Sequence, residues 1–89
     1  MPSYFEKDPS AILDYQVNWT DWLTTDTIAS STWTVPDGIT KVTDVTDDTK
    51  ATIWLSGGTV GKRYTITNRI VTAGGRQDER SITIKIVNK

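Results

Sequence analysis

The clearest pattern in the chain is an alternation of apolar and polar residues near its C-terminus. Ile82, Ile84 and Ile86 alternate with polar residues, and a period of two places all three on one face of a β-strand. The run from Tyr64 to Ile70 alternates in the same way, and segment 73–76 joins the two runs through glycines that tolerate a positive φ. The sequence therefore predicts a C-terminal β-hairpin.

Earlier segments have the same character and are separated by proline, glycine and aspartate. Further strands are predicted over 11–17, 28–35, 39–45 and 51–55. Segment 21–23 is predicted to form one helical turn that carries the chain across the end of the fold. The first ten residues include two prolines and are expected to form a flexible arm.

The number and rhythm of these strands indicate the fold class. Six or seven short strands at intervals of about 8 to 12 residues are typical of an immunoglobulin-like sandwich. We predict an all-β chain with a flexible arm over 1–10 and, over 11–89, a single immunoglobulin-like β-sandwich of about six to seven antiparallel strands. Tyr64 follows a glycine turn, where such domains have a tyrosine corner, although it could also be an ordinary strand aromatic.

The composition restricts the chemistry that the chain can perform. The 89 residues include neither cysteine nor histidine, so the commonest general base and the usual zinc ligands are missing. An enzyme would need a carboxylate pair such as Asp44 and Asp47 in a cleft, for which so small a chain offers little room. We expect neither enzymatic activity nor a cofactor.

Charge and hydropathy argue against two classes of partner. The net charge is −1, and the basic residues near the C-terminus are interleaved with acidic ones, so no field attracts nucleic acid. No apolar run approaches the roughly 20 residues of a membrane span. Residues 1–10 also lack the basic and apolar parts of a signal peptide. We expect no binding to nucleic acid or membrane.

Two loops have some features of ligand sites. Asp44, Asp47 and Asp48 could supply oxygens to calcium, but their spacing matches no EF-hand, and aspartate is favoured in turns for conformational reasons. Segment 57–62 has the glycines and lysine of a phosphate loop, yet a strand follows it where such a loop needs a helix. We predict structural turns at both places and keep calcium as a minor alternative.

The four tryptophans are numerous for so short a chain and can serve either a core or a contact surface. Trp33 is predicted to lie in the core. Trp19 and Trp22 should share one face of the helical turn that closes the sandwich. Trp54 lies between two inward residues of its strand, so its ring should point outward, where an exposed tryptophan usually marks a contact surface.

The order of short motifs along the chain resembles one protein family. The motifs are Lys7-Asp8-Pro9, Leu13-Asp14-Tyr15, Asp21-Trp22-Leu23, Asp26-Thr27-Ile28, segment 54–59 with Gly61 and Tyr64, and Gly75-Arg76 with Asp78 and Arg80. From Lys7 to Val87 the chain thereby resembles the small fibre–tail adaptor proteins of tailed bacteriophages. The resemblance implies a non-catalytic virion protein, made in the bacterial host cytoplasm, that docks phage tail, neck or fibre proteins.

The residues that we nominate for partner binding lie in three places. They are Tyr4, Phe5 and Asp8 in the arm, the outward Trp54, and Arg76, Asp78 and Arg80 at the hairpin tip. Apolar residues on an arm can order against a partner, and mixed charges on a loop can serve recognition. An exposed edge strand could bind as well. Assembly as a ring in the virion is kept open.

Two other functions stay open at this point. A capsid decoration or head-completion protein would use the same kind of fold. A carbohydrate-binding adhesive module would instead use the tryptophans as platforms for sugar rings.

Overall fold

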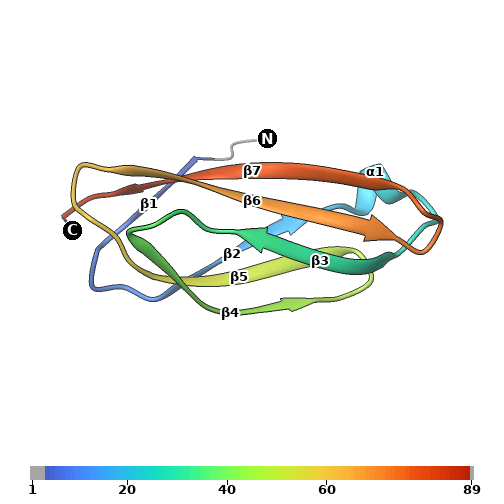
Figure 1. The fold of residues 1–89 in the computed structure, drawn as a ribbon, viewed down its shortest axis with the longest axis horizontal. Coiled ribbons are helices and arrows are strands. Elements are labelled where there is room, and N and C mark those ends of the chain that lie inside the picture. Colours follow the sequence, from blue (N-terminus) through green and yellow to red (C-terminus); the bar gives the residue numbers. More distant parts are fainter. Residues whose placement is uncertain (1–3, 89) are drawn as a thin grey trace.

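The computed structural model describes residues 4–88, which form two β-sheets packed face to face (Figure 1). Sheet A has the strand order β1-β7-β6-β3, with β1 at Tyr4–Lys7, β7 at Gln77–Ile86, β6 at Arg63–Thr72 and β3 at Ile28–Thr34. Sheet B has the order β2-β5-β4, with β2 at Leu13–Asn18, β5 at Lys50–Gly57 and β4 at Ile39–Thr46. The prediction of an all-β, immunoglobulin-like sandwich of about six to seven strands is confirmed, with seven strands in the described residues.

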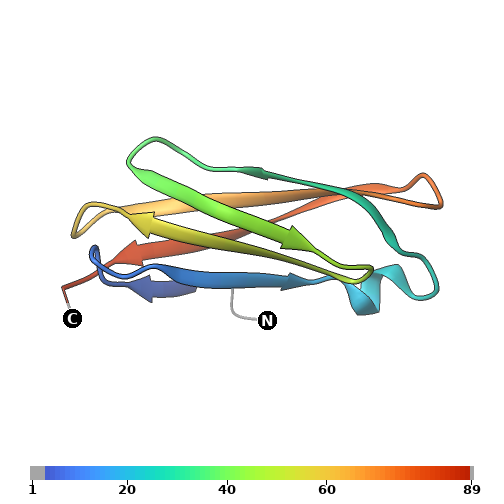
Figure 2. The same cartoon turned by 90° about the horizontal axis from the view of Figure 1, so that it is seen from below.

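The molecule is elongated, and its two ends carry different elements. It measures 42 × 23 × 16 Å along its principal axes. The short helix α1 (Thr20–Leu23) and the β6–β7 turn lie at one end, which we call the α1 end (Figures 1 and 2). β1 and the β3–β4 and β5–β6 turns lie at the other, which we call the β1 end. The helical turn and the C-terminal hairpin are therefore where the sequence predicts them.

The core forms because apolar residues occupy the inward positions of both sheets. Ile82, Ile84 and Ile86 of β7 are buried, and Ile53 and Leu55 of β5 face them from sheet B without any exposed surface. Trp33 belongs to the same cluster, as predicted, with 8% exposure. Period-two alternation thus becomes one apolar layer between two sheets.

β1 is a correction to the predicted flexible arm. Tyr4–Lys7 pair in parallel with β7, with Tyr4 opposite Thr83 and Lys7 opposite Ile86. These residues are therefore part of sheet A, and this pair of strands is parallel where only antiparallel pairing was expected. Residues 1–3 of the predicted arm lie outside the described residues.

The buried side chain of Lys7 helps to hold β1 in place. Lys7 has no exposed surface, and its Nζ donates hydrogen bonds to the carbonyl oxygens of Asp8 at 2.9 Å and Gly57 at 2.8 Å. Gly57 ends β5, so the second bond joins the edge of sheet A to sheet B. Burial lowers the pKa of Lys7, because removing a charged ammonium group from water is unfavourable.

The tyrosine corner is present at the β1 end. The Tyr64 hydroxyl accepts a hydrogen bond from the backbone N–H of Thr59 at 3.1 Å, and the ring is buried. Gly38 lies against this ring with a φ of +101°, and a Cβ there would stand 3.0 Å from the Tyr64 hydroxyl. The corner therefore depends on a glycine in a neighbouring turn as well as on the tyrosine.

A buried polar pair fastens the α1 end. The Trp19 indole Nε1–H donates to the Asn68 Oδ1 at 3.0 Å, and neither residue has any exposed surface. The Asn68 amide donates in turn to Ser31 Oγ at 2.8 Å and to the Thr32 carbonyl at 3.4 Å. This network connects the start of α1 to β6 and β3.

We predict that Asn68→Ala lowers the free energy of unfolding by about 1–3 kcal/mol, because it leaves the buried Trp19 N–H without an acceptor. Urea denaturation measures the change. Thr65→Ala, at an exposed outer position of the same strand, is the control and should change stability by less than about 0.5 kcal/mol. Equal effects of the two substitutions would contradict a special role for the Asn68 amide.

Tyr64→Phe should lower the free energy of unfolding by about 0.5–1.5 kcal/mol, the usual net contribution of one hydrogen bond. Tyr4→Phe removes a hydroxyl from a ring that is 44% exposed and is the matched control. Thermal unfolding followed by circular dichroism compares the two. If both variants have the melting temperature of the wild type, the hydrogen bond of the Tyr64 hydroxyl contributes nothing to stability.

Candidate partner-contact surfaces

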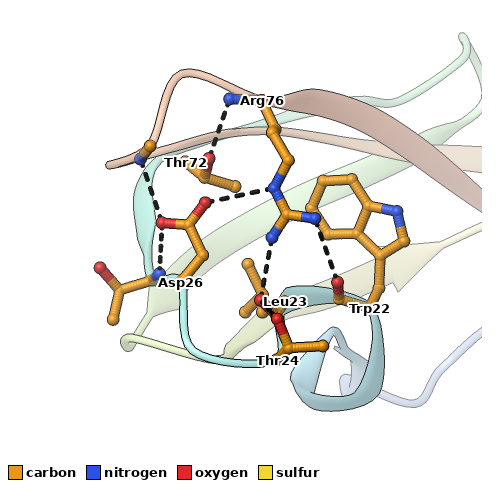
Figure 3. A network of polar contacts seen from close by, with 8 residues as sticks. Trp22, Leu23, Thr24, Asp26, Thr72 and Arg76 are labelled. Atoms are coloured by element: carbon orange, nitrogen blue, oxygen red, sulfur yellow. Dashed lines mark hydrogen bonds and ion pairs between the residues drawn. The ribbon is translucent and has the colours of Figure 1, made fainter.

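Arg76 lies at the α1 end and is held by groups of its own chain (Figure 3). Its Nε–H forms an ion pair with Asp26 Oδ2 at 3.3 Å, and its two terminal nitrogens donate to the carbonyl oxygens of Trp22 at 3.3 Å and Leu23 at 2.9 Å. The guanidinium also lies over the Trp22 ring, 4.4 Å from its centroid. Arg76 thus caps the C-terminal carbonyls of α1 and ties the β6–β7 turn to the helix.

Asp26 is the acceptor at the centre of the same network. Its Oδ1 accepts the backbone N–H groups of Thr27 at 2.9 Å and Gly74 at 3.0 Å. These donors, with the Thr72 hydroxyl as the largest contribution, lower the pKa of Asp26 from 3.8 to about 2. Asp26 was not among the predicted site residues, because the aspartate lies in a connection between α1 and β3 and nothing in the sequence links it to the distant hairpin.

The other two residues nominated at the hairpin lie in different surroundings. Arg80 covers the Trp19 ring at 4.3 Å and donates to the Asn18 carbonyl at 3.1 Å. Asp78 is exposed and accepts the N–H of Glu79 at 2.8 Å. The two arginines therefore have internal structural partners, and Asp78 and Arg76 are the exposed members of the three nominated residues.

The residues nominated from the N-terminal segment lie together at the β1 end. Tyr4 is 44% exposed on the outer face of sheet A, and the Arg63 guanidinium lies 5.9 Å from its ring centroid. Phe5 points the other way and packs against Tyr15, with ring centroids 5.1 Å apart. Asp8 is partly buried and accepts the Ser10 N–H at 2.8 Å. Tyr4 is the residue of this group that presents a large accessible surface.

Trp54 lies on the outer face of sheet B, as predicted. It alternates with the buried Ile53 and Leu55 and is itself half-buried between Asp14 of β2 and Thr43 of β4. This face is separate from both ends of the molecule. The structure therefore distributes the seven nominated residues over β1, the start of β7 with its turn, and the outer face of sheet B, and does not gather them into one site.

The two loops with features of ligand sites are turns. Asp47 Oδ1 accepts the N–H groups of Thr49 at 2.8 Å and Lys50 at 2.7 Å, which lowers its pKa, and Asp44 pairs with Lys41 at 3.0 Å. Segment 57–62 contains three glycines with positive φ and leads directly into β6. Within residues 4–88 no group of three or more acidic side chains is placed to hold a metal ion.

α1, the one helix in the described part of the chain, has four residues and is far too short to cross a membrane.

The outer face of sheet A carries an arrangement of charges that only the strand register defines. Arg63 of β6 stands directly opposite Lys85 of β7, and Glu6 of β1 stands on the other side of Lys85. Further along the same two strands, Arg69 stands opposite Glu79. Sequence reasoning missed the first pair, because residues 22 positions apart meet only once the hairpin register is known.

The fold places the chain in the class of immunoglobulin-like β-sandwiches. Among solved structures it is similar to the PKD domain from the KIAA 1837 protein, with a TM-score of 0.60, 16% identity, and coverage of 99% of this chain and 81% of that one. A model of the family described as the podophage GP4 fiber-tail adaptor protein gp77 matches residues 7–85. The chain belongs to that family. No curated protein sequence matches it.

The acid sensitivity of the α1 end can be tested with Asp26→Asn. Because the folded pKa of Asp26 lies below the unfolded value, its stabilisation is present above about pH 4 and is lost as pH falls through about 2. We expect the difference in urea midpoint between wild type and Asp26→Asn to narrow over this range. Asp78→Asn is the control variant. If the difference in urea midpoint between wild type and Asp26→Asn stays constant with pH, this account of Asp26 is wrong.

Proposed function

We propose that this chain is a non-catalytic virion adaptor that joins a tail or neck component to a fibre component through contacts at its two opposite ends. The family assignment supports the adaptor class over a capsid decoration protein or a sugar-binding module. The observation that carries the two-ended arrangement is the placement of the two residues along β7: Asp78 lies near the start of this strand, and Tyr4 stands opposite Thr83, five residues or about 17 Å further along.

An adaptor needs two accessible surfaces that do not obstruct each other. Tyr4 offers an exposed aromatic ring at the β1 end, and aromatic residues are enriched among the energetically dominant contacts of interfaces. Asp78 is exposed near the start of β7, next to the β6–β7 turn that Arg76 ties to α1. A contact loop that is already ordered loses little entropy on binding.

The proposal assigns no chemistry to the chain. Asp44 and Asp47 each have separate partners, namely Lys41 and the N–H groups of the next turn, and do not converge on a common cleft. The site of action is the assembled virion, after synthesis in the host cytoplasm. A ring of copies remains compatible with contacts at the ends, because the long sides of the sandwich would then be available to neighbours.

Bridging by purified components tests the proposal. The chain is mixed with the tail and fibre proteins of the same virion, and size-exclusion chromatography with light scattering follows the complexes. We expect a ternary complex with wild type, loss of one component with Tyr4→Ser, and loss of the other with Asp78→Lys. Trp54→Ser, on the outer face of sheet B, is the matched control and should keep both.

Each alternative result has a distinct meaning. Wild type that binds neither component, or only one, contradicts the adaptor proposal. Loss of both components in one of the end variants, with melting temperature unchanged, contradicts the arrangement of one partner at each end.

A further inference from the structure

We propose that the outer face of sheet A at the β1 end binds an acidic polypeptide segment through Arg63, Lys85 and Lys62, with Tyr4 beside them. We call these four residues the basic patch. The inference rests on the proposed function only for the identity of the partner, a component of the virion. The chemistry of the segment comes from the patch itself.

The register places two positive charges directly opposite each other. Arg63 and Lys85 are Cα partners across β6 and β7 on the outer face, where opposed side chains have Cβ atoms about 5 Å apart. Like charges in this position destabilise a sheet. Among residues 4–88, neither side chain forms an ion pair, although Glu6 stands opposite Lys85 on the neighbouring strand.

Other groups at this end add to the positive field. Lys62 is exposed in the turn immediately before Arg63. The buried ammonium of Lys7 on β1 donates to the carbonyl oxygens of Asp8 and Gly57, and the neighbouring Asp8 carboxylate offsets part of its charge. Glu6 offsets one of these charges. The surrounding outer positions are hydroxyls, with Thr65 opposite Thr83 in the next row, so the positive charge stands on a neutral sheet surface.

The same two strands place opposite charges in another row of the outer face, although these two side chains form no ion pair among residues 4–88. Arg69 stands opposite Glu79 on the outer face, and it donates a hydrogen bond to Gln77. Opposite charges in this position stabilise the sheet. The contrast shows that the topology does not require the arrangement at the β1 end. An unfavourable pair of like charges on a stable scaffold is the kind of local conflict that marks a functional surface.

An acidic protein segment fits this patch better than other anions do. Three cations around one exposed ring are few for a nucleic acid or a lipid surface, whose binding increases with the number of neutralised charges. Tyr4 supplies an apolar contact for side chains next to the carboxylates.

Two double variants separate function from structure. Arg63→Thr with Lys85→Thr removes the opposed cations and substitutes the residue type of the adjacent row. Arg69→Thr with Glu79→Thr, on the same strands and face, is the matched control. We expect the first variant to melt at the wild-type temperature or higher, because repulsion is relieved. A clear loss of thermal stability would instead mean that the two cations serve the fold.

The binding test uses a short oligoglutamate peptide, with oligoglutamine of equal length as the uncharged comparison. We expect the assigned amide NMR spectrum to shift around Tyr4, Arg63 and Lys85 with oligoglutamate alone. Affinity should fall about tenfold in the patch variant, as the loss of two surface ion pairs implies, and stay constant in the control variant. It should also weaken as salt is raised.

The inference would be overturned by shifts that do not centre on the patch, by equal binding of the peptide to both double variants, or by sedimentation with phosphatidylglycerol vesicles through the same residues. Success or failure of the adaptor proposal is scored separately, by ternary complex formation. If wild type bridges tail and fibre proteins and the patch variant still does so, the adaptor stands and the acidic segment is wrong. If oligoglutamate binds the patch but wild type forms no ternary complex with the tail and fibre proteins, the acidic-segment inference stands and the adaptor proposal is wrong.

Discussion

The hydrogen bond between the Trp19 indole and the Asn68 side chain is the interaction on which the rest of the fold depends. At this point the chain leaves sheet B after β2 and enters sheet A at β3, so the two sheets must be held in one relative position. The bond is 3.0 Å long and fully buried, and the Asn68 amide nitrogen donates further hydrogen bonds to Ser31 and Thr32. Without its partner, each polar group would be left in an apolar layer.

The α1 end is built around this bond in layers. Arg80 covers the Trp19 ring, Trp22 meets it edge-on with ring centroids 5.4 Å apart, and Arg76 covers Trp22. Cations over aromatic faces shield the rings from water while keeping their own charge hydrated. Arg76 and Arg80, which the sequence nominates for partner recognition, therefore stabilise the surface from which the β6–β7 hairpin projects.

The β1 end is constructed on a different basis. Here Lys7 and Tyr64 each use one polar atom to reach the backbone of the β5–β6 region, and both side chains are otherwise buried. These contacts fix β1 and the first residues of β6 side by side with β7, which in turn sets the outer-face rows that contain Tyr4, Arg63 and Lys85. The internal bonds at this end thereby determine which charges meet on its surface.

The sequence by itself determined the strands that bury alternate residues, the turns between them and the outward Trp54, because each depends on neighbours within a few positions. For Tyr64 the sequence left a tyrosine corner and an ordinary strand aromatic open, and the hydrogen bond from the Thr59 N–H decided for the corner. The motif order also indicated the family. Only the tertiary structure decided that Tyr4–Lys7 is a strand, since a lysine at its inward position hides the alternation and its partner lies at the far end of the chain. The same holds for the Arg76–Asp26 pair and the opposed cations, because contacts 50 and 22 residues apart follow from register and packing and leave no local pattern.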